Sequence, residues 1–259
     1  MRPVSELLKA PVLGHSLHDV LYEVFDFIAN LDDDEDDRQG LIAYILPSLM
    51  SAGINYKVNT RMEFPPLTTD DTWELYNDIY TNLQGGRFAM WYKDADAVYQ
   101  IASIPGNYLE IGTAHGGSAV MAGKAKKSGG IYCVDPLNER HHVIGNFHKF
   151  GIEGVTLIRK MTPPLPEELD GIEFSAVLID ADHTGLFPRN DWLSVKDKVT
   201  PGGYVMFHDI HRKACYSALQ LAAETPGWTK VAEYSHIGHG FSTDRSMGTF
   251  GIVQRNNGI

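Results

Sequence analysis

The chain has 259 residues with ordinary apolar and charged fractions, which bounds it to one large α/β domain or one domain with an appendage. Its formal net charge of −11 disfavours nucleic acid as a partner, because phosphate binding needs Lys and Arg. No apolar run is long enough to cross a membrane, the N-terminus lacks the apolar core of a signal peptide, and the few cysteines favour a reduced, cytoplasmic setting.

Residues 1–92 are predicted to form a helical N-terminal extension. Apolar residues recur there at three- and four-residue steps, which is the spacing of amphipathic helices. The acidic run "LDDDEDDR" at 31–38 is interpreted as a solvated loop between two helices. We expect the extension to cap the substrate site or to join copies of the chain, so that the protein is a homo-oligomer. The expected helices span 16–31, 41–50, a segment opening at Thr69 or Asp70, and 93–104.

From Asn107 onward the pattern changes to short apolar runs separated by helical or turn segments. The runs "YLEI", "IYCV", "VTLI", "AVLI" and "YVMF" begin roughly 20 to 28 residues apart, an alternation typical of βαβ units and a parallel sheet. Between two of them, Trp192, Val195 and Val199 are expected to form one helix face, ended by "TPGG". The last two runs, "WTKVAEYS" and "TFGIVQ", have no helix between them and should form an antiparallel pair.

The first of these runs leads into a glycine-rich turn, "LEIGTAHGG". Glycines allow a tight turn and a close approach of a ligand to the backbone. The spacing of Gly112, Ala114 and Gly117 is a degraded dinucleotide fingerprint. Asp135 ends the next run, where a carboxylate can accept hydrogen bonds from ribose hydroxyls. The pattern favours a nucleotide-type cofactor, and the alternative is a tight strand-to-helix connection with incidental acids.

Residues 107–254 resemble a class I S-adenosylmethionine-dependent methyltransferase. The resemblance rests on "LEIGTAHGG", "VDP", "LIDADH", "TPGGYVMFHDIH" and the terminal strand pair, with Ala114 in place of the usual middle glycine. It implies a Rossmann-like, doubly wound α/β sheet of seven strands, mostly parallel with the last strand antiparallel, in a domain over 93–259. It also implies that S-adenosylmethionine is the cofactor, held by the first-strand acid, the glycine turn and the second-strand acid. The implied cofactor-binding residues are Glu110, Gly112, Thr113, Ala114, Gly116, Asp135, Pro136 and Asp180.

Acids and a histidine follow the fourth and fifth runs, where ligands bind in open parallel sheets. Asp180 follows "AVLI", and His208 and Asp209 follow "YVMF" within one residue. The sequence resembles, more narrowly, small-molecule O-methyltransferases that act on macrolide and aminocoumarin sugars, in which acids at these places hold a metal against the substrate hydroxyls. The resemblance implies that Asp180, Asp209 and His208 bind a divalent cation, Mg²⁺ or Mn²⁺. His208 stands where some relatives carry an acid, so a softer metal such as Zn²⁺, Fe²⁺ or Mn²⁺, or a core-facing role for this histidine, stays open.

The stretch "DADHTG" after the fourth run supplies candidates for a general base. A hydroxyl nucleophile must lose its proton, which a bound metal favours and a nearby base accepts. In the resembling sugar methyltransferases a base occupies this stretch. His183 is the preferred catalytic candidate because its ordinary pKa lies near neutrality, and Asp182 is the second. A histidine on a plain surface turn is the alternative.

The leading hypothesis is an O-methyltransferase that acts on a small hydroxylated metabolite with the help of a divalent metal. One alternative is a nicotinamide-dependent oxidoreductase with the same glycine turn, which would require an all-parallel second half. The other is a catalytically inactive cofactor-binding or assembly protein, because a fold alone does not settle function. The acids Glu110, Asp135, Asp180 and Asp209 weigh against a loss of catalysis.

Overall fold

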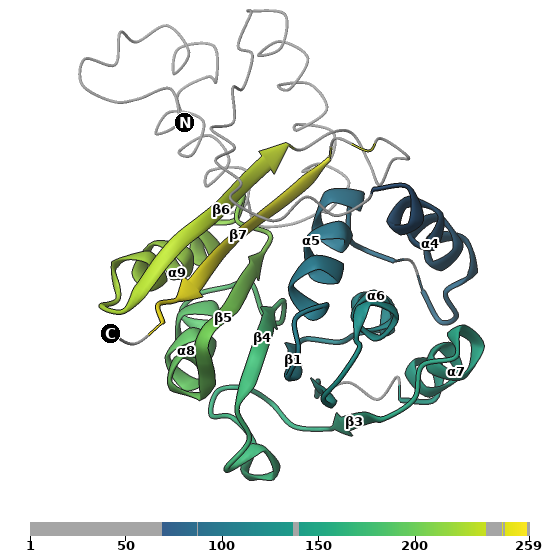
Figure 1. Cartoon of the computed structure of the whole chain (residues 1–259), viewed down its shortest axis with the longest axis horizontal. Helices are drawn as coiled ribbons and strands as arrows, with labels where there is room; N and C mark the ends of the chain where they lie inside the picture. Colours follow the sequence, from purple (N-terminus) through teal and green to yellow (C-terminus); the bar gives the residue numbers. More distant parts are fainter. Residues whose placement is uncertain (1–68, 87, 137–139, 237–244, 246, 258–259) are drawn as a thin grey trace, which may run out of the picture. The chain divides into compact units, whose positions relative to one another are not determined.

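A computed structural model describes most of the chain beyond residue 68 (Figure 1). The helices expected over 16–31 and 41–50, and the acidic run 31–38, lie outside the described residues. In the part that the structure describes, no helix combines the length and the apolar character that crossing a membrane needs. The described ranges are 69–86, 88–136, 140–236, 245 and 247–257.

Two helices, α4 (Thr69–Asn82) and α5 (Tyr92–Ala102), precede the sheet and confirm the predicted helices in this region. Tyr76 of α4 is buried in the same apolar cluster as Val120 of helix α6 (Gly117–Ala125). The described end of the N-terminal extension therefore shares a core with the sheet that follows it. The domain boundary between residues 92 and 93 stays a prediction.

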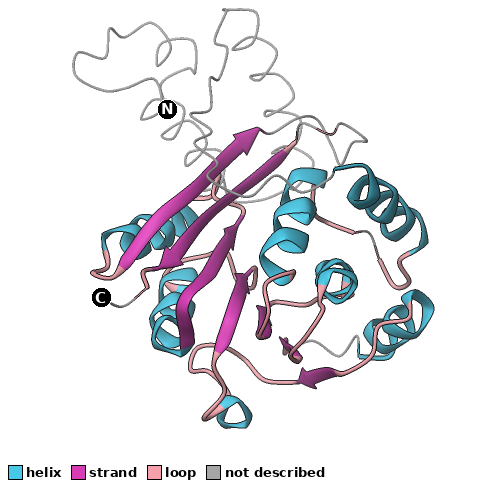
Figure 2. Ribbon diagram, viewed as in Figure 1, coloured by secondary structure: helices cyan, strands magenta, loops and turns pink. Residues whose placement is uncertain are grey.

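The described residues form one seven-stranded sheet in the order β3-β2-β1-β4-β5-β7-β6 (Figures 1 and 2). Strands β1 to β5 pair in parallel, whereas β7 runs antiparallel to both β5 and β6. This confirms the predicted mostly parallel sheet with an antiparallel last strand. The strand order reverses between β1 and β4, and ligands of such folds bind beyond the carboxyl ends of strands at this switch point. The strands are β1 (Asn107–Ile111), β2 (Ile131–Val134), β3 (Val155–Ile158), β4 (Phe174–Ile179), β5 (Val199–His208), β6 (Trp228–His236) and β7 (Gly248–Arg255).

Helices cover both faces of the sheet (Figure 2). Helices α5, α6 and α7 (Arg140–Phe150) contribute to one apolar cluster, and α8 (Phe187–Val195) and α9 (Lys213–Glu224) contribute to the other. Successive side chains of a strand point to opposite faces, so Tyr108 of β1 joins the first cluster and Leu109 joins the second. This doubly wound arrangement leaves the carboxyl edge of the sheet for a site.

The expectation that Val199 lies on a helix is wrong. Helix α8 ends at Val195, a short 3-10 turn follows, and Val199 opens β5 opposite Phe174 of β4. The register of this pair then shifts before Tyr204, so that Pro201 falls in an irregular stretch of the strand. Proline cannot donate to a strand ladder and is tolerated at such places, which is why "TPGG" lies within a strand here.

Candidate active site

The glycine turn connects β1 to helix α6, and its first glycine is required by the protein's own backbone. Gly112 has φ +91°, and an added Cβ would lie 2.1 Å from the carbonyl oxygen of Asp180. The amide of Asp180 in turn donates to the carbonyl of Ile111 at 2.8 Å. The sequence suggested that this glycine lets a ligand approach, but its nearest neighbour is the end of β4. The turn and Asp180 are therefore fixed against each other.

Asp135, at the end of β2, holds the same turn by hydrogen bonds. The backbone amides of Thr113 and Ala114 donate to Asp135 Oδ2 at 2.7 and 2.8 Å. Ala114, which replaces the usual glycine, keeps the left-handed backbone with φ 43°. Gly116, with φ 85°, precedes the first residue of α6, and Pro136 lies exposed directly after Asp135. The structure thus places these predicted cofactor residues around one turn.

Glu110 is a fully buried acid on β1, beside this turn. The hydroxyl of Tyr108 donates to its Oε2 at 3.0 Å, whereas its Oε1 finds no hydrogen-bond partner among the described residues. Burial raises the pKa of Glu110 to about 8, and the nearby charge of Asp180 acts in the same direction. An acid with an unsatisfied buried oxygen can accept a donor from a ligand.

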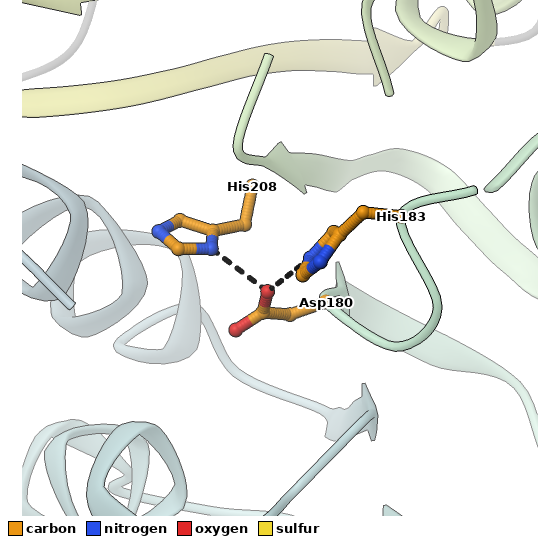
Figure 3. Close-up of side chains that lie close together, drawn as sticks. All are labelled: Asp180, His183 and His208. Atoms are coloured by element: carbon orange, nitrogen blue, oxygen red, sulfur yellow. Dashed lines mark hydrogen bonds and ion pairs between the residues drawn. The ribbon is translucent and has the colours of Figure 1, made fainter. Parts of the chain in front are cut away.

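Asp180, His183 and His208 meet at the carboxyl ends of β4 and β5 (Figure 3). Asp180 Oδ1 lies 2.7 Å from His208 Nδ1 and 3.0 Å from His183 Nε2. One potential ligand atom from each residue lies within 4.8 Å of those of the other two. The predicted base and two of the predicted metal ligands therefore form a single cluster.

Within the cluster, the pKa of Asp180 is lowered and the pKa of His208 is raised, which favours a negative and a positive charge side by side. Burial alone would raise the pKa of Asp180, but the charge of His208 and hydrogen bonds from His183 and His208 lower it to about 2. Burial would lower the pKa of His208, but Asp180 and Asp209 raise it well above its usual value. Asp180 is thus an anion held between two imidazole rings.

Asp209, the remaining predicted metal ligand, follows β5 with a left-handed backbone at φ 53°. Its carboxylate lies 3.5 Å from His208 Nδ1 and 3.7 Å from His183 Nε2, and 3.3 Å from Nε of Arg212. Such a backbone is uncommon outside glycine and is concentrated at functional sites. Asp209 therefore borders the cluster while it also pairs with an exposed arginine.

Asp94 completes the cluster and was not anticipated from the sequence. It lies on α5, is fully buried, and places Oδ2 3.3 Å from His208 Nε2. The amide of Thr249 on β7 donates to its Oδ1 at 2.6 Å. His208 consequently has a carboxylate at each ring nitrogen. His208 is buried, as the alternative of a core-facing histidine expected, but its ring nitrogens contact carboxylates and not only apolar side chains.

Asp182, the second candidate base, is not brought into the cluster. It is exposed, and its Oδ1 accepts hydrogen bonds from the amide and the hydroxyl of Thr184 at 2.8 and 2.7 Å. A cavity of about 450 Å³ also lies away from the cluster, at the amino ends of β1, β4 and β5, where Asn107, Ser175 and Thr200 line it. The carboxyl edge of the sheet remains the candidate site.

The cluster offers donors that suit a divalent cation. Carboxylate oxygens come from Asp180 and Asp209, and imidazole nitrogens from His183 and His208. Mg²⁺ prefers oxygen ligands alone, whereas mixed oxygen and imidazole sets suit Mn²⁺, Fe²⁺, Co²⁺ or Zn²⁺. The residues therefore fit a divalent metal, and their two imidazole nitrogens distinguish the set from the oxygen-only ligands that Mg²⁺ prefers.

Comparison with known proteins agrees with this architecture. Residues 109–210 match a family model described as a methyltransferase domain, and a search of curated proteins found no match. Cofactor-bound Rv0187 from MTB is 16% identical with a TM-score of 0.58, over 73% of this chain and 91% of that one. The O-methyltransferase TomG from Streptomyces achromogenes, in complex with SAM, is 12% identical with a TM-score of 0.52, over 87% and 100%. An O-methyltransferase from Bacillus cereus, in complex with SAH, is 12% identical with a TM-score of 0.51, over 90% and 97%.

At these low sequence identities the structural similarity establishes the fold alone. The family match adds a methyltransferase domain over residues 109–210. The antiparallel β7 also removes the nicotinamide-dependent alternative in the form predicted, because that alternative required an all-parallel second half. The matched domain contains the glycine turn, Asp135, and the cluster residues Asp180, His183 and His208. Residues 109–210 accordingly match a methyltransferase domain, and the seven-stranded sheet that contains them has the fold of the solved O-methyltransferases.

Proposed function

We propose that the protein transfers the methyl group of S-adenosylmethionine to a hydroxyl oxygen of a small hydroxylated metabolite. The observation that carries this proposal is the cluster of Asp180, His183 and His208, fixed beside the glycine turn by the contact between Gly112 and Asp180. Methyl transfer requires the acceptor, the methyl carbon and the sulfur to be aligned, which is an effect of positioning. The close backbone contact between Gly112 and Asp180 would hold a donor bound at the turn and an acceptor bound at the cluster in a fixed relation.

The donor side consists of Glu110, the 112–117 turn and Asp135. S-adenosylmethionine carries an ammonium group and ribose hydroxyls, and buried or half-buried carboxylates are suitable acceptors for both. Asp135 Oδ2 already accepts two turn amides, so that a ribose bound there would be connected directly to the turn. The unsatisfied Oε1 of Glu110 provides a second acceptor.

On the acceptor side, we assign His183 as the general base. With Nε2–H donated to Asp180 Oδ1 at 3.0 Å, the other ring nitrogen of His183 can accept the proton of the hydroxyl. The Asp180 carboxylate then stabilises the imidazolium that forms, as a carboxylate does in other acid–histidine pairs. Asp182 has no comparable contact with the cluster, so we place it outside the proton transfer.

Asp180, Asp209 and His208 would hold the divalent cation. A cation bound there would lower the pKa of an acceptor hydroxyl. The carboxylates supply the negative charge for binding, and Asp94 behind His208 fixes that ring. The homo-oligomer remains part of the proposal, with contacts expected from residues 1–92.

Transfer from a donor with a ¹³C-labelled methyl group to a panel of phenols, catechols and sugar derivatives tests this function. We expect a new methyl ether in the product by nuclear magnetic resonance, and a loss of turnover after treatment with EDTA. A label on nitrogen or carbon would overturn the O-methyl assignment. Full turnover in EDTA would remove the metal and leave the base.

A further inference from the structure

Asp94 is a buried carboxylate that is neither a metal ligand nor the base of the proposed function. Its exposed fraction is 0%, although it lies in the first turn of α5, where most acids are solvated. Part of its environment is a helix cap, because the amide of Trp91 donates to Oδ2 at 3.3 Å. A cap requires only a half-exposed acid, so capping explains the position of Asp94 and leaves its burial unexplained.

The remaining contacts of Asp94 lead to β7 and β5. The amide of Thr249 donates to Oδ1 at 2.6 Å, and Oδ2 lies 3.3 Å from His208 Nε2. Helix α5 thus places its carboxylate between a backbone amide of β7 and the Nε2 atom of His208 on β5. The other ring nitrogen, Nδ1, lies 2.7 Å from Asp180 and 3.5 Å from Asp209.

This arrangement is the one that proteins use behind a metal-bound histidine. A ligating imidazole donates its second N–H to a carboxylate, which fixes the ring and makes the ligating nitrogen a better donor. In His208 the nitrogen on the Asp94 side is Nε2, and the nitrogen on the cluster side is Nδ1. Asp94 therefore orients Nδ1 toward Asp180 and His183.

We propose that Asp94 is a positioning residue that makes His208 a nitrogen ligand, so that the site selects Mn²⁺, Co²⁺ or Zn²⁺ over Mg²⁺. The inference rests on the metal-assisted function proposed above and specifies which class of metal that function uses. Imidazole nitrogen favours these metals, whereas Mg²⁺ favours oxygen and retains water ligands.

Metal binding to the full chain tests the proposal independently of turnover. Protein stripped with a chelator is titrated with Co²⁺ and with Mg²⁺ by calorimetry, and a Mn²⁺-loaded sample is examined by pulsed electron paramagnetic resonance for ¹⁴N coupling. We expect the wild type to bind Co²⁺ more tightly than Mg²⁺ and to show nitrogen coupling. Asp94→Asn should weaken Co²⁺ binding about 10- to 100-fold, the usual effect of losing such a partner.

Two further variants separate metal selection from folding. Asp96→Asn is the matched control, because Asp96 is a buried acid on the same helix that accepts from Thr72 and Gln100 outside the cluster. It should leave the Co²⁺ affinity unchanged. His208→Asp should shift the preference toward Mg²⁺ and reduce the ¹⁴N coupling, and it remains informative if Asp94→Asn does not fold.

The outcomes distinguish this inference from the function beneath it. Metal binding with Mg²⁺ preferred and no ¹⁴N coupling would overturn the nitrogen ligand and leave metal-assisted methyl transfer intact. Equal Co²⁺ affinities in the wild type and in a folded Asp94→Asn variant would overturn the positioning role of Asp94. An absence of divalent metal binding, together with full turnover in EDTA, would overturn both the inference and the metal in the proposed function.

Discussion

The proposed donor side and the proposed acceptor side of the site are built in different ways. The donor side, Glu110 to Asp135, comes from one βαβ unit, and backbone amides, left-handed residues and one buried acid form it. The acceptor side combines side chains from α5, the ends of β4 and β5, and a backbone amide of β7. The first is determined by local chain geometry, and the second by how distant elements pack.

This difference predicts different responses to substitution. A turn made of backbone tolerates changes of side chain and fails when its conformation is forbidden. A cluster made of side chains keeps its fold when one member is changed and loses its chemistry instead. Gly112 represents the first behaviour and His183 the second, although both contact Asp180 at the end of β4.

Gly112→Ala should produce the largest effect, a loss of folding stability of more than about 4 kcal/mol. The new Cβ would lie 2.1 Å from the carbonyl oxygen of Asp180, and the backbone would remain at φ +91°. Gly227→Ala is the control, because its φ is +85° and no atom lies within 4 Å of an added Cβ, so only about 1–2 kcal/mol is expected. Thermal unfolding measures both, and similar melting temperatures would show that the turn is not locked against β4.

His183→Ala should leave the fold intact and lower turnover about 10²- to 10⁴-fold, the range for loss of a general base. The deficit should shrink as the pH rises, because the acceptor hydroxyl then ionises without assistance. His148→Ala, at an exposed position on α7, is the matched histidine control and should retain full turnover. A ratio of rates that stays constant with pH would show that His183 positions groups and accepts no proton.

The same difference explains what the sequence could predict. The glycine turn and Asp135 lie within 27 residues of one another along 109–135, and their spacing alone indicates a nucleotide-type site. The strand-end residues Asp180, His208 and Asp209 were predictable as well, because parallel strands deliver their carboxyl ends to one edge. The antiparallel last strand followed from the absence of a helix between the final two apolar runs.

Asp94 could not be predicted, and neither could the strand at Val199. In "WYKDAD" an acid three residues after a helix start indicates a cap, and nothing local shows that the helix buries it against β5 and β7. Pro201 and its glycines indicate a helix end and a turn, whereas the pairing of Val199 with β4 before them, and of Tyr204 with β4 and β7 after them, places them within β5. In both cases tertiary contacts decide what local sequence leaves open. Asp182 shows that a motif can also suggest too much: it lies two residues after Asp180, but its side chain bonds to Thr184 and not to the cluster.

Asp135→Ala tests the donor side by affinity. Removing the carboxylate deletes charge-assisted hydrogen bonds of about 1.5–3 kcal/mol each, so donor binding should weaken at least about 10-fold. The KM for the acceptor should change little, because Asp135 holds the glycine turn from β2, whereas the cluster around Asp180 lies at the ends of β4 and β5. Calorimetry with S-adenosylhomocysteine measures the affinity. Unchanged affinity would move the ribose away from β2, and tight binding of NAD in its place would contradict the donor assignment.

Glu110→Gln should produce the smallest effect, and its sign depends on pH. The folded-state pKa of about 8 lies above the ordinary value of 4.5, so folded protein retains a proton that unfolded protein releases between these values. The stabilisation from this group is complete below about pH 4.5 and is lost as the pH rises through 8. Glutamine does not titrate, so the stability of the variant relative to wild type should rise by about 2 kcal/mol between pH 6 and pH 8. Denaturant unfolding at both pH values measures the gain. A difference that does not change with pH would mean that Glu110 is already ionised, stabilised in place by its contacts with Tyr108 and the turn.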